Sequence, residues 1–187
     1  SVKDRDNLGS TPLHIAVRWG AQKAAEKLIK LGININAQNS AGKSPLAEAV
    51  IANKYDVTKY LLENGADPNS CDANGITILM DTIRAQNAQI VKLLLNYGAN
   101  PNLQQINGQN AYHEAAYMAN TEIISLIRNA GGNPLSRDKE GNTPFSIVLK
   151  KDIKVINEVL GNSYNITDSD GNSPLHIVVK NKGSTTL

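Results

Sequence analysis

The residues best suited to metal chemistry gather in one short segment. From His113 to Tyr117 the chain reads His-Glu-Ala-Ala-Tyr. Two histidines four residues apart on one helix bind zinc, and a glutamate beside the first acts as general base in metalloproteases. Tyr117 stands where the second histidine must be, so the segment predicts no zinc site.

The other two histidines do not complete such a site. His14 and His176 occupy the same position of a repeated pattern as His113, so stacked repeats place the three side chains several repeat widths apart. Zinc ligands lie about 2 Å from one shared metal. No glycine-rich loop follows a strand, and no motif supports a serine or cysteine nucleophile. We therefore expect a protein that is not an enzyme, with no catalytic residue, metal or cofactor.

Three carboxylates recur at a fixed spacing. Glu48, Asp81 and Glu114 are each 33 residues apart, and equivalent positions of stacked repeats form a column. This column could receive a basic partner, or less readily supply an acid and a base for catalysis. The favoured interpretation is that each is a helix-surface charge, with Asp81 meeting Arg84 three residues further on.

The elements that position these residues come from an internal repeat. Glycines recur every 33 residues and then after a step of 30, at Gly9, Gly42, Gly75, Gly108, Gly141 and Gly171. A second series has the same period and another phase, at Gly32, Gly65, Gly98 and Gly131. Self-similarity at this period predicts a solenoid, in which each unit buries its apolar face against its neighbours.

Each unit reads as two short helices and a polar turn. Thr11-Pro12 is a helix start, since the hydroxyl can cap free N–H groups and proline suits the first helical position. A second helix is expected from about Lys23 to Leu31, with Gly32 as its left-handed cap. The polar stretch 33–38 favours a turn or an open hairpin.

These motifs resemble the ankyrin repeat. Its signature Thr-Pro-Leu-His-x-Ala stands at Thr11 to Ala16 and nearly returns at Ser173 to His176. The second half of the family pattern stands at 61–69 and again at 94–102. The resemblance covers about residues 6–181 and implies an all-α repeat solenoid, each repeat a helix-turn-helix plus a hairpin.

The resemblance also predicts the organisation of the chain. We expect one domain over 1–187, with repeats at about 6–38, 39–71, 72–104, 105–137 and 138–167 and a partial sixth at 168–187. Repeats three and four lack the proline at the start of the first helix. Repeat five is three residues shorter, with the losses expected in its inter-helix turn and near Leu160-Gly161.

Residue roles follow from the same resemblance. The histidines are expected to bond within their turns, and Asn36, Asn69 and Asn102 to brace the hairpins. Ligands of this family meet the hairpin tips and the concave face of the first helices. Carried over by position, the partner-binding residues are Leu8, Arg18, Trp19, Lys43, Ile51, Ile76, Arg84, Ile106, Tyr117, Met118, Lys150 and Lys151.

Composition limits the alternatives. The net charge of +2 over 187 residues does not by itself indicate a nucleic-acid or membrane partner. The single cysteine, Cys71, cannot form an internal disulfide, and neither a signal peptide nor a membrane span is visible. These features favour a cytoplasmic location. Both ends look cut, as in a fragment of a longer protein.

The function predicted first is a non-catalytic scaffold for a protein or peptide partner, because tryptophan, tyrosine, methionine and arginine are types enriched in interfaces. One alternative is nucleic-acid binding through six basic residues: Arg18, Lys43, Arg84, Lys139, Lys150 and Lys151. The three carboxylates interrupt this basic surface. Another is a regulatory arm of an enzyme that lies outside this chain. The protein is expected to be a monomer or a weak end-to-end dimer.

Overall fold

The structure is a computed structural model that describes residues 4–151, 156–161, 167–168 and 170–183. The described part is a row of helix pairs, and no strand longer than the isolated bridge between Cys71 and Thr77 occurs in it. The helices are α1 Pro12–Arg18, α2 Gln22–Lys30, α3 Pro45–Ile51, α4 Tyr55–Glu63, α5 Ile78–Arg84, α6 Ala88–Asn96, α7 Ala111–Met118, α8 Thr121–Asn129, α9 Pro144–Lys151, α10 Ile156–Leu160 and α11 Pro174–Gly183. The predicted all-helical repeat solenoid is confirmed.

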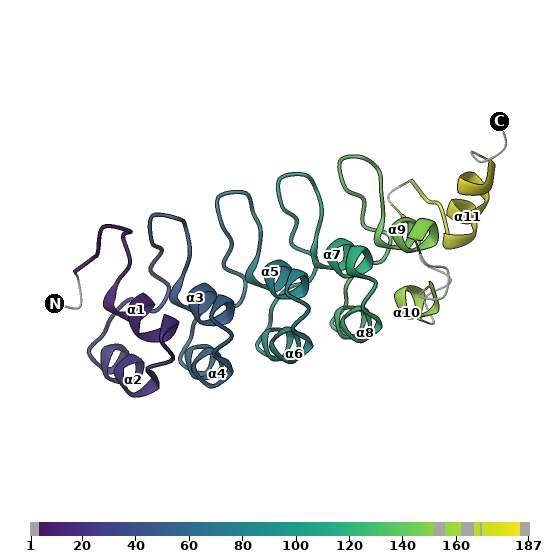
Figure 1. Ribbon diagram of the computed structural model, residues 1–187. Helices are drawn as coiled ribbons and strands as arrows, with labels where there is room; N and C mark the ends of the chain where they lie inside the picture. Colours follow the sequence, from purple (N-terminus) through teal and green to yellow (C-terminus); the bar gives the residue numbers. More distant parts are fainter. Residues whose placement is uncertain (1–3, 152–155, 162–166, 169, 184–187) are drawn as a thin grey trace.

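The pairs stack side by side in chain order (Figure 1). We number the repeats by these pairs, from repeat 1 with α1 and α2 to repeat 5 with α9 and α10. The first helices form one layer and the second helices another. A long loop projects beyond the first-helix layer ahead of each first helix, so all the loops stand on the same side.

Helix starts follow the predicted signals. Helices α1, α3, α9 and α11 begin at the prolines. Repeats 3 and 4 lack the proline, yet α5 and α7 begin at the equivalent residues, Ile78 and Ala111. The capping side chain is sufficient there: Thr77 accepts the N–H of Met80, and Asn110 accepts the N–H of His113.

The core is one buried position repeated along the row. Leu13, Leu46, Leu79, Tyr112 and Phe145 are each 33 residues apart, and none is more than 1% exposed. These side chains fill the space between neighbouring first and second helices, which is how a repeat array builds a continuous core. In the last repeat the equivalent Leu175 is 72% exposed, because no described segment packs against it.

The shortened fifth repeat is expected to lose residues in its inter-helix turn and at the end of its second helix near Leu160-Gly161. The turn, 152–155, lies outside the described residues, and α10 ends at Leu160. Of the second helix of this repeat, the five residues of α10 are described.

Candidate functional site

The loops and the outward sides of the first helices form one continuous surface, which we call the loop-side surface (Figure 1). Its loops are built by one side chain that folds back on its own backbone. Asp6 Oδ1, for example, accepts the N–H groups of Leu8 and Ser10 at 2.9 and 2.8 Å. The same arrangement recurs at Asn39, Asp72, Asp138 and Asp168. These turns hold the loop tips in equivalent positions.

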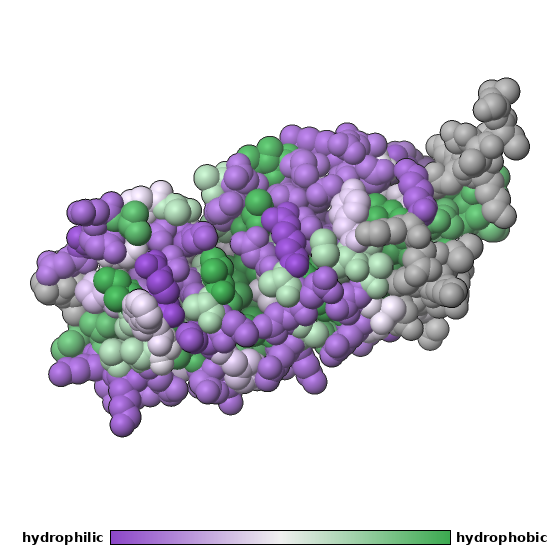
Figure 2. Space-filling model, viewed as in Figure 1, coloured by the Kyte–Doolittle hydropathy of each residue, from purple (hydrophilic) through white to green (hydrophobic). Residues whose placement is uncertain are grey.

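Apolar side chains interrupt the hydrophilic residues along the first-helix layer (Figure 2). Four of the predicted partner-binding residues are large and mostly exposed: Trp19 78%, Ile106 62%, Leu8 61% and Ile51 53%. Met118 and Lys150 are exposed as well, whereas Arg18, Lys43, Ile76, Arg84 and Tyr117 are half-buried. Lys151 ends α9, and its side chain lies outside the described residues.

Both predicted arginines are engaged within the protein. Arg18 donates from Nε and Nη2 to the carboxylate of Glu48, both at 3.1 Å, across the boundary between repeats 1 and 2. Arg84 Nη2 donates to Glu114 at 2.5 Å across the boundary between repeats 3 and 4. The forked Arg18–Glu48 pair is fixed in geometry, and a hydrogen bond to the adjoining carboxylate raises the pKa of both arginines. These contacts neutralise two of the cations on which nucleic-acid binding was to depend.

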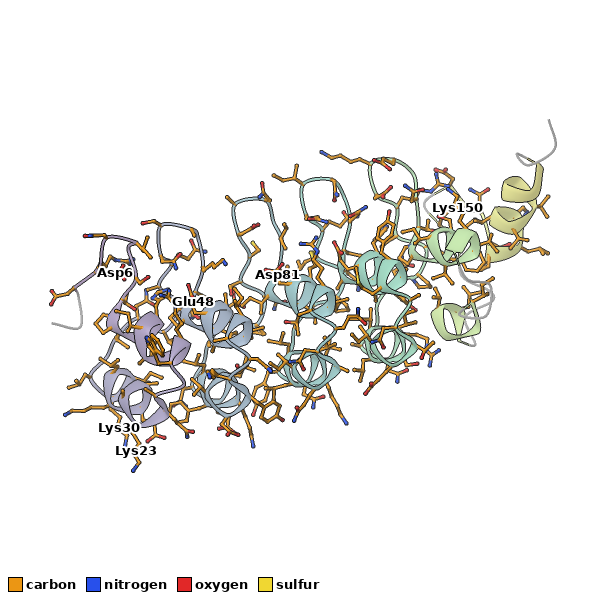
Figure 3. All side chains as sticks on the ribbon, in the orientation of Figure 1. Asp6, Lys23, Lys30, Glu48, Asp81 and Lys150 are labelled. Carbon is orange, nitrogen blue, oxygen red and sulfur yellow. The ribbon has the colours of Figure 1, made fainter. Side chains whose placement is uncertain are left out.

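The three carboxylates of the predicted column therefore differ in whether an arginine of the preceding repeat binds them. Glu48 and Glu114 accept an arginine from the preceding repeat, and also Asn39 and Gln105 respectively. Asp81 has no cross-repeat partner among the described residues; it meets Arg84 of its own helix at 3.4 Å, as the spacing predicted. Glu48 and Asp81 both lie on the loop side of the first helices (Figure 3). Burial raises the pKa of Asp81, and the charges of Arg84 and of Lys43 in the preceding repeat oppose the shift.

The predicted bonding of the histidines within their turns is confirmed for all three, and His176 Nδ1 lies 2.8 Å from the Ser173 hydroxyl. His14 Nδ1 lies 2.8 Å from the Thr11 hydroxyl, and Nε2 lies 2.9 Å from the carbonyl oxygen of Lys43 in the next repeat. His113 lies in the same way between Asn110 and the carbonyl of Asn142. Burial lowers the pKa of the His14 and His113 rings. No grouping of metal-ligand side chains occurs in the described part of the chain, and no helix there is long and apolar enough to cross a membrane.

The asparagines predicted to brace their own hairpins instead join neighbouring repeats through their side chains. Asn69 donates to the carbonyl of Gly98 at 3.2 Å and accepts the N–H of Asn100 at 2.7 Å. Asn36 and Asn102 make the same pair of contacts one repeat before and one repeat after. The second-helix side of the row is thereby tied together along repeats 1 to 4.

Sequence reasoning missed the arginine–glutamate pairs between repeats. Their signal is a spacing of 30 residues, which is one repeat less one helical turn. The arginine at the end of one first helix thus meets the carboxylate in the middle of the next.

Comparisons with known proteins agree with this geometry. A family model described as "Ankyrin repeats (3 copies)" matches residues 1–72 and 46–138. The crystal structure of the ankyrin repeat domain of Bcl-3, a member of the IkappaB protein family, is similar with a TM-score of 0.80 and 25% identity. The similarity covers 85% of this chain and 71% of that one. No curated protein sequence matches.

Proposed function

The chain belongs to the ankyrin-repeat family, and from that premise we propose that it is a non-catalytic scaffold that binds a protein or peptide on its loop-side surface. Ankyrin repeats are generally protein-interaction scaffolds. The observation that supports this surface is the exposure of Leu8, Trp19, Ile51 and Ile106 on a fold whose core is complete without them.

Trp19 and Ile51 are the exposed side chains that we expect to contribute most to binding. An apolar side chain that moves from water into an interface contributes roughly 25 cal/mol per Å² of buried area. Tryptophan is among the types that most often dominate binding energy. Both side chains are held at the ends of short helices packed into the array, so little ordering is required when a partner binds.

Nucleic-acid binding is the weaker proposal. Arg18 and Arg84 are paired with glutamates, which leaves Lys43, Lys139 and Lys150 as its described cations. Lysines spread over several repeats, with Glu140 and Asp81 between them, do not form a continuous basic surface.

The test is capture of interacting proteins from the native lysate, followed by titration of the purified candidate. We expect Trp19→Ala/Ile51→Ala to weaken the dissociation constant by roughly 100-fold, since each anchor of this kind contributes about 1–2 kcal/mol. The matched control is Leu31→Ala/Tyr97→Ala, which removes exposed apolar groups at the ends of second helices. Equal loss in both double variants, or in neither, contradicts the proposed surface.

A further inference from the structure

The boundary between repeats 2 and 3 differs from its neighbours at the loop tips. At three other boundaries a backbone N–H of one tip donates to a carbonyl of the preceding tip at 2.9 Å; these are Ser40 to Leu8, Ile106 to Asn74 and Lys139 to Asn107. The equivalent pair here is Ala73 and Ala41, and no such bond joins them. A Cβ added to Gly42 would lie 3.9 Å from the nitrogen of Ala73, against 3.0 Å between Gly108 and Lys139. The two tips therefore stand further apart.

The same boundary lacks the arginine–carboxylate pair. Ile51 occupies the position that Arg18 holds one repeat earlier and Arg84 one repeat later. Asp81 occupies the position of Glu48 and Glu114, so it faces an isoleucine that cannot donate a hydrogen bond. The 3.4 Å contact with Arg84 is a weak substitute, because Arg84 is also held at 2.5 Å by Glu114.

The base of this boundary is nevertheless firmly held. Asn69 links the segments that follow α4 and α6, through Gly98 and Asn100. Asn87 Nδ2 donates to Asn53 Oδ1 at 2.8 Å between the inter-helix turns. Repeats 2 and 3 are thus joined near their second helices and separated at their loop tips, so the packing of the array itself holds the tips apart.

The opening is a notch with an apolar and an acidic wall. Hollows lie on both sides of the Ile51–Asp81 pair, one of about 70 Å³ towards the loop tips and one of about 310 Å³ towards the turn at Asn53. Ile51 and Ile76 line the apolar wall, and Asp81 and Asp72 supply the carboxylates. Lys43 is the basic residue among those that line this hollow, and it lies close enough to attract the carboxylate of Asp81 without bonding to it. The Asp81 side chain is 48% exposed. Partial burial raises its pKa while Arg84 and Lys43 oppose the shift, and a cation that covers the carboxylate removes the remaining solvent and strengthens the attraction.

We propose that this notch binds an arginine side chain of the partner, with its guanidinium on Asp81 and an adjoining apolar residue on Ile51. The proposal rests on the proposed function and names the chemistry of the partner. Arginine is favoured over lysine because the chain pairs an arginine with a carboxylate at both neighbouring boundaries. Arg18 forms a forked pair with Glu48, and Arg84 donates one hydrogen bond to Glu114 and one to Asp81. The partner's arginine would take the place of the internal arginine that is absent here because the equivalent position is Ile51.

The test is selection of peptides from a random displayed library on the whole chain, followed by titration of the enriched peptides. We expect them to carry an arginine beside an apolar residue. Replacing that arginine by citrulline, which keeps the shape and removes the charge, should weaken binding roughly tenfold for the wild type. The same replacement should change the dissociation constant of the Asp81→Asn variant by less than about twofold, because the carboxylate charge that the arginine would pair with is already absent.

Two controls separate the outcomes. Asp56→Asn changes an exposed acid on a second helix and should leave the citrulline effect intact. Ile51→Arg puts an internal arginine into the notch and should abolish the dependence on the peptide arginine. Enriched peptides without arginine, or with a citrulline effect that Asp81→Asn does not reduce, overturn the notch and leave the scaffold proposal standing. Failure to enrich any peptide contradicts both.

Discussion

Arg18 and Glu48 are 30 residues apart in the sequence, yet the guanidinium donates two hydrogen bonds of 3.1 Å to the carboxylate. The pair joins the end of one first helix to the middle of the next. The carboxylate is 12% exposed and the guanidinium side chain 38%, so solvent screens the interaction only in part. The stability of a solenoid depends on the interfaces between neighbouring repeats, and this ion pair is a side-chain contact within one such interface.

We expect Glu48→Gln to lower the free energy of unfolding by about 1 kcal/mol, since it removes a hydrogen-bonded charge from a partly screened pair. Urea unfolding measures this, and a double-mutant cycle with Arg18→Met isolates the pair. The control is Glu63→Gln, whose contact with Lys59 spans 3.8 Å between half-exposed side chains. It should change stability by less than about 0.5 kcal/mol. Zero coupling between Arg18 and Glu48 would show that the pair is formed without stabilising the boundary.

The missing tip bond predicts a local difference in hydrogen exchange. The backbone N–H groups of Ser40, Ile106 and Lys139 each donate to the preceding tip at 2.9 Å, whereas that of Ala73 has no such acceptor. Exposed, unbonded amides exchange fastest. We expect the Ala73 amide to exchange at least about tenfold faster than the other three, relative to their intrinsic rates. Exchange followed by NMR measures this, and equal protection at all four tips contradicts a parted boundary.

The core column predicts where truncation is costly. Leu79 is 1% exposed between neighbouring repeats, so Leu79→Ala should cost about 2–5 kcal/mol. Ile106 is 62% exposed on a tip, and Ile106→Ala should lie within about 0.5 kcal/mol of the wild type. Thermal or urea unfolding distinguishes the two. A large loss at Ile106 would mean that the tip packs onto the array, which would also remove it from the proposed binding surface.

Stability should depend on pH through the two buried histidines. Burial lowers the pKa of His14 and His113 below 6.5 in the folded state, so the unfolded chain takes up protons first as the pH falls. Their contribution is complete above about pH 6.5 and is lost as the pH drops from there towards the folded pKa values, at up to about 1.4 kcal/mol per pH unit for each histidine.

Urea unfolding at pH 7 and pH 5 measures this loss, with His14→Gln/His113→Gln as the comparison. The double variant should be less stable at pH 7, because the contacts to the next repeat change, but its stability should vary less between the two pH values. Identical pH profiles for both proteins would assign the acid sensitivity elsewhere. The contribution of Asp168 is present at both pH values and is lost only at lower pH: burial opposes its ionisation, but hydrogen bonds from Arg137 and Asn172 outweigh this and hold its pKa well below the usual range.

Much of the fold could be predicted because it depends on local signals. Proline or a capping side chain at the start of the first helix, and an apolar residue two positions beyond the cap, are read directly from the chain, as at Thr11 and Leu13. The loop-side surface also follows, since the repeat fixes which positions face outward. The register between neighbouring repeats could not be predicted in this way. Whether Arg18 meets Glu48 depends on the rise and rotation from one repeat to the next, which no single residue determines. The notch at Ile51 is visible only once that register is known.

Replacing Ile51 by arginine should complete the row of pairs that Arg18 and Arg84 begin. The new side chain meets Asp81 in the geometry of its neighbours, so we expect a gain of about 0.2–1 kcal/mol in the free energy of unfolding. Ile51 is 53% exposed, and its loss therefore removes little buried apolar area. The gain should vanish in Ile51→Arg/Asp81→Asn and shrink at high salt. Ile51→Met, which lengthens the side chain without a charge, is the control. If Ile51→Met stabilises as much as Ile51→Arg, the notch is an apolar groove, and the carboxylate of Asp81 has no part in what it binds.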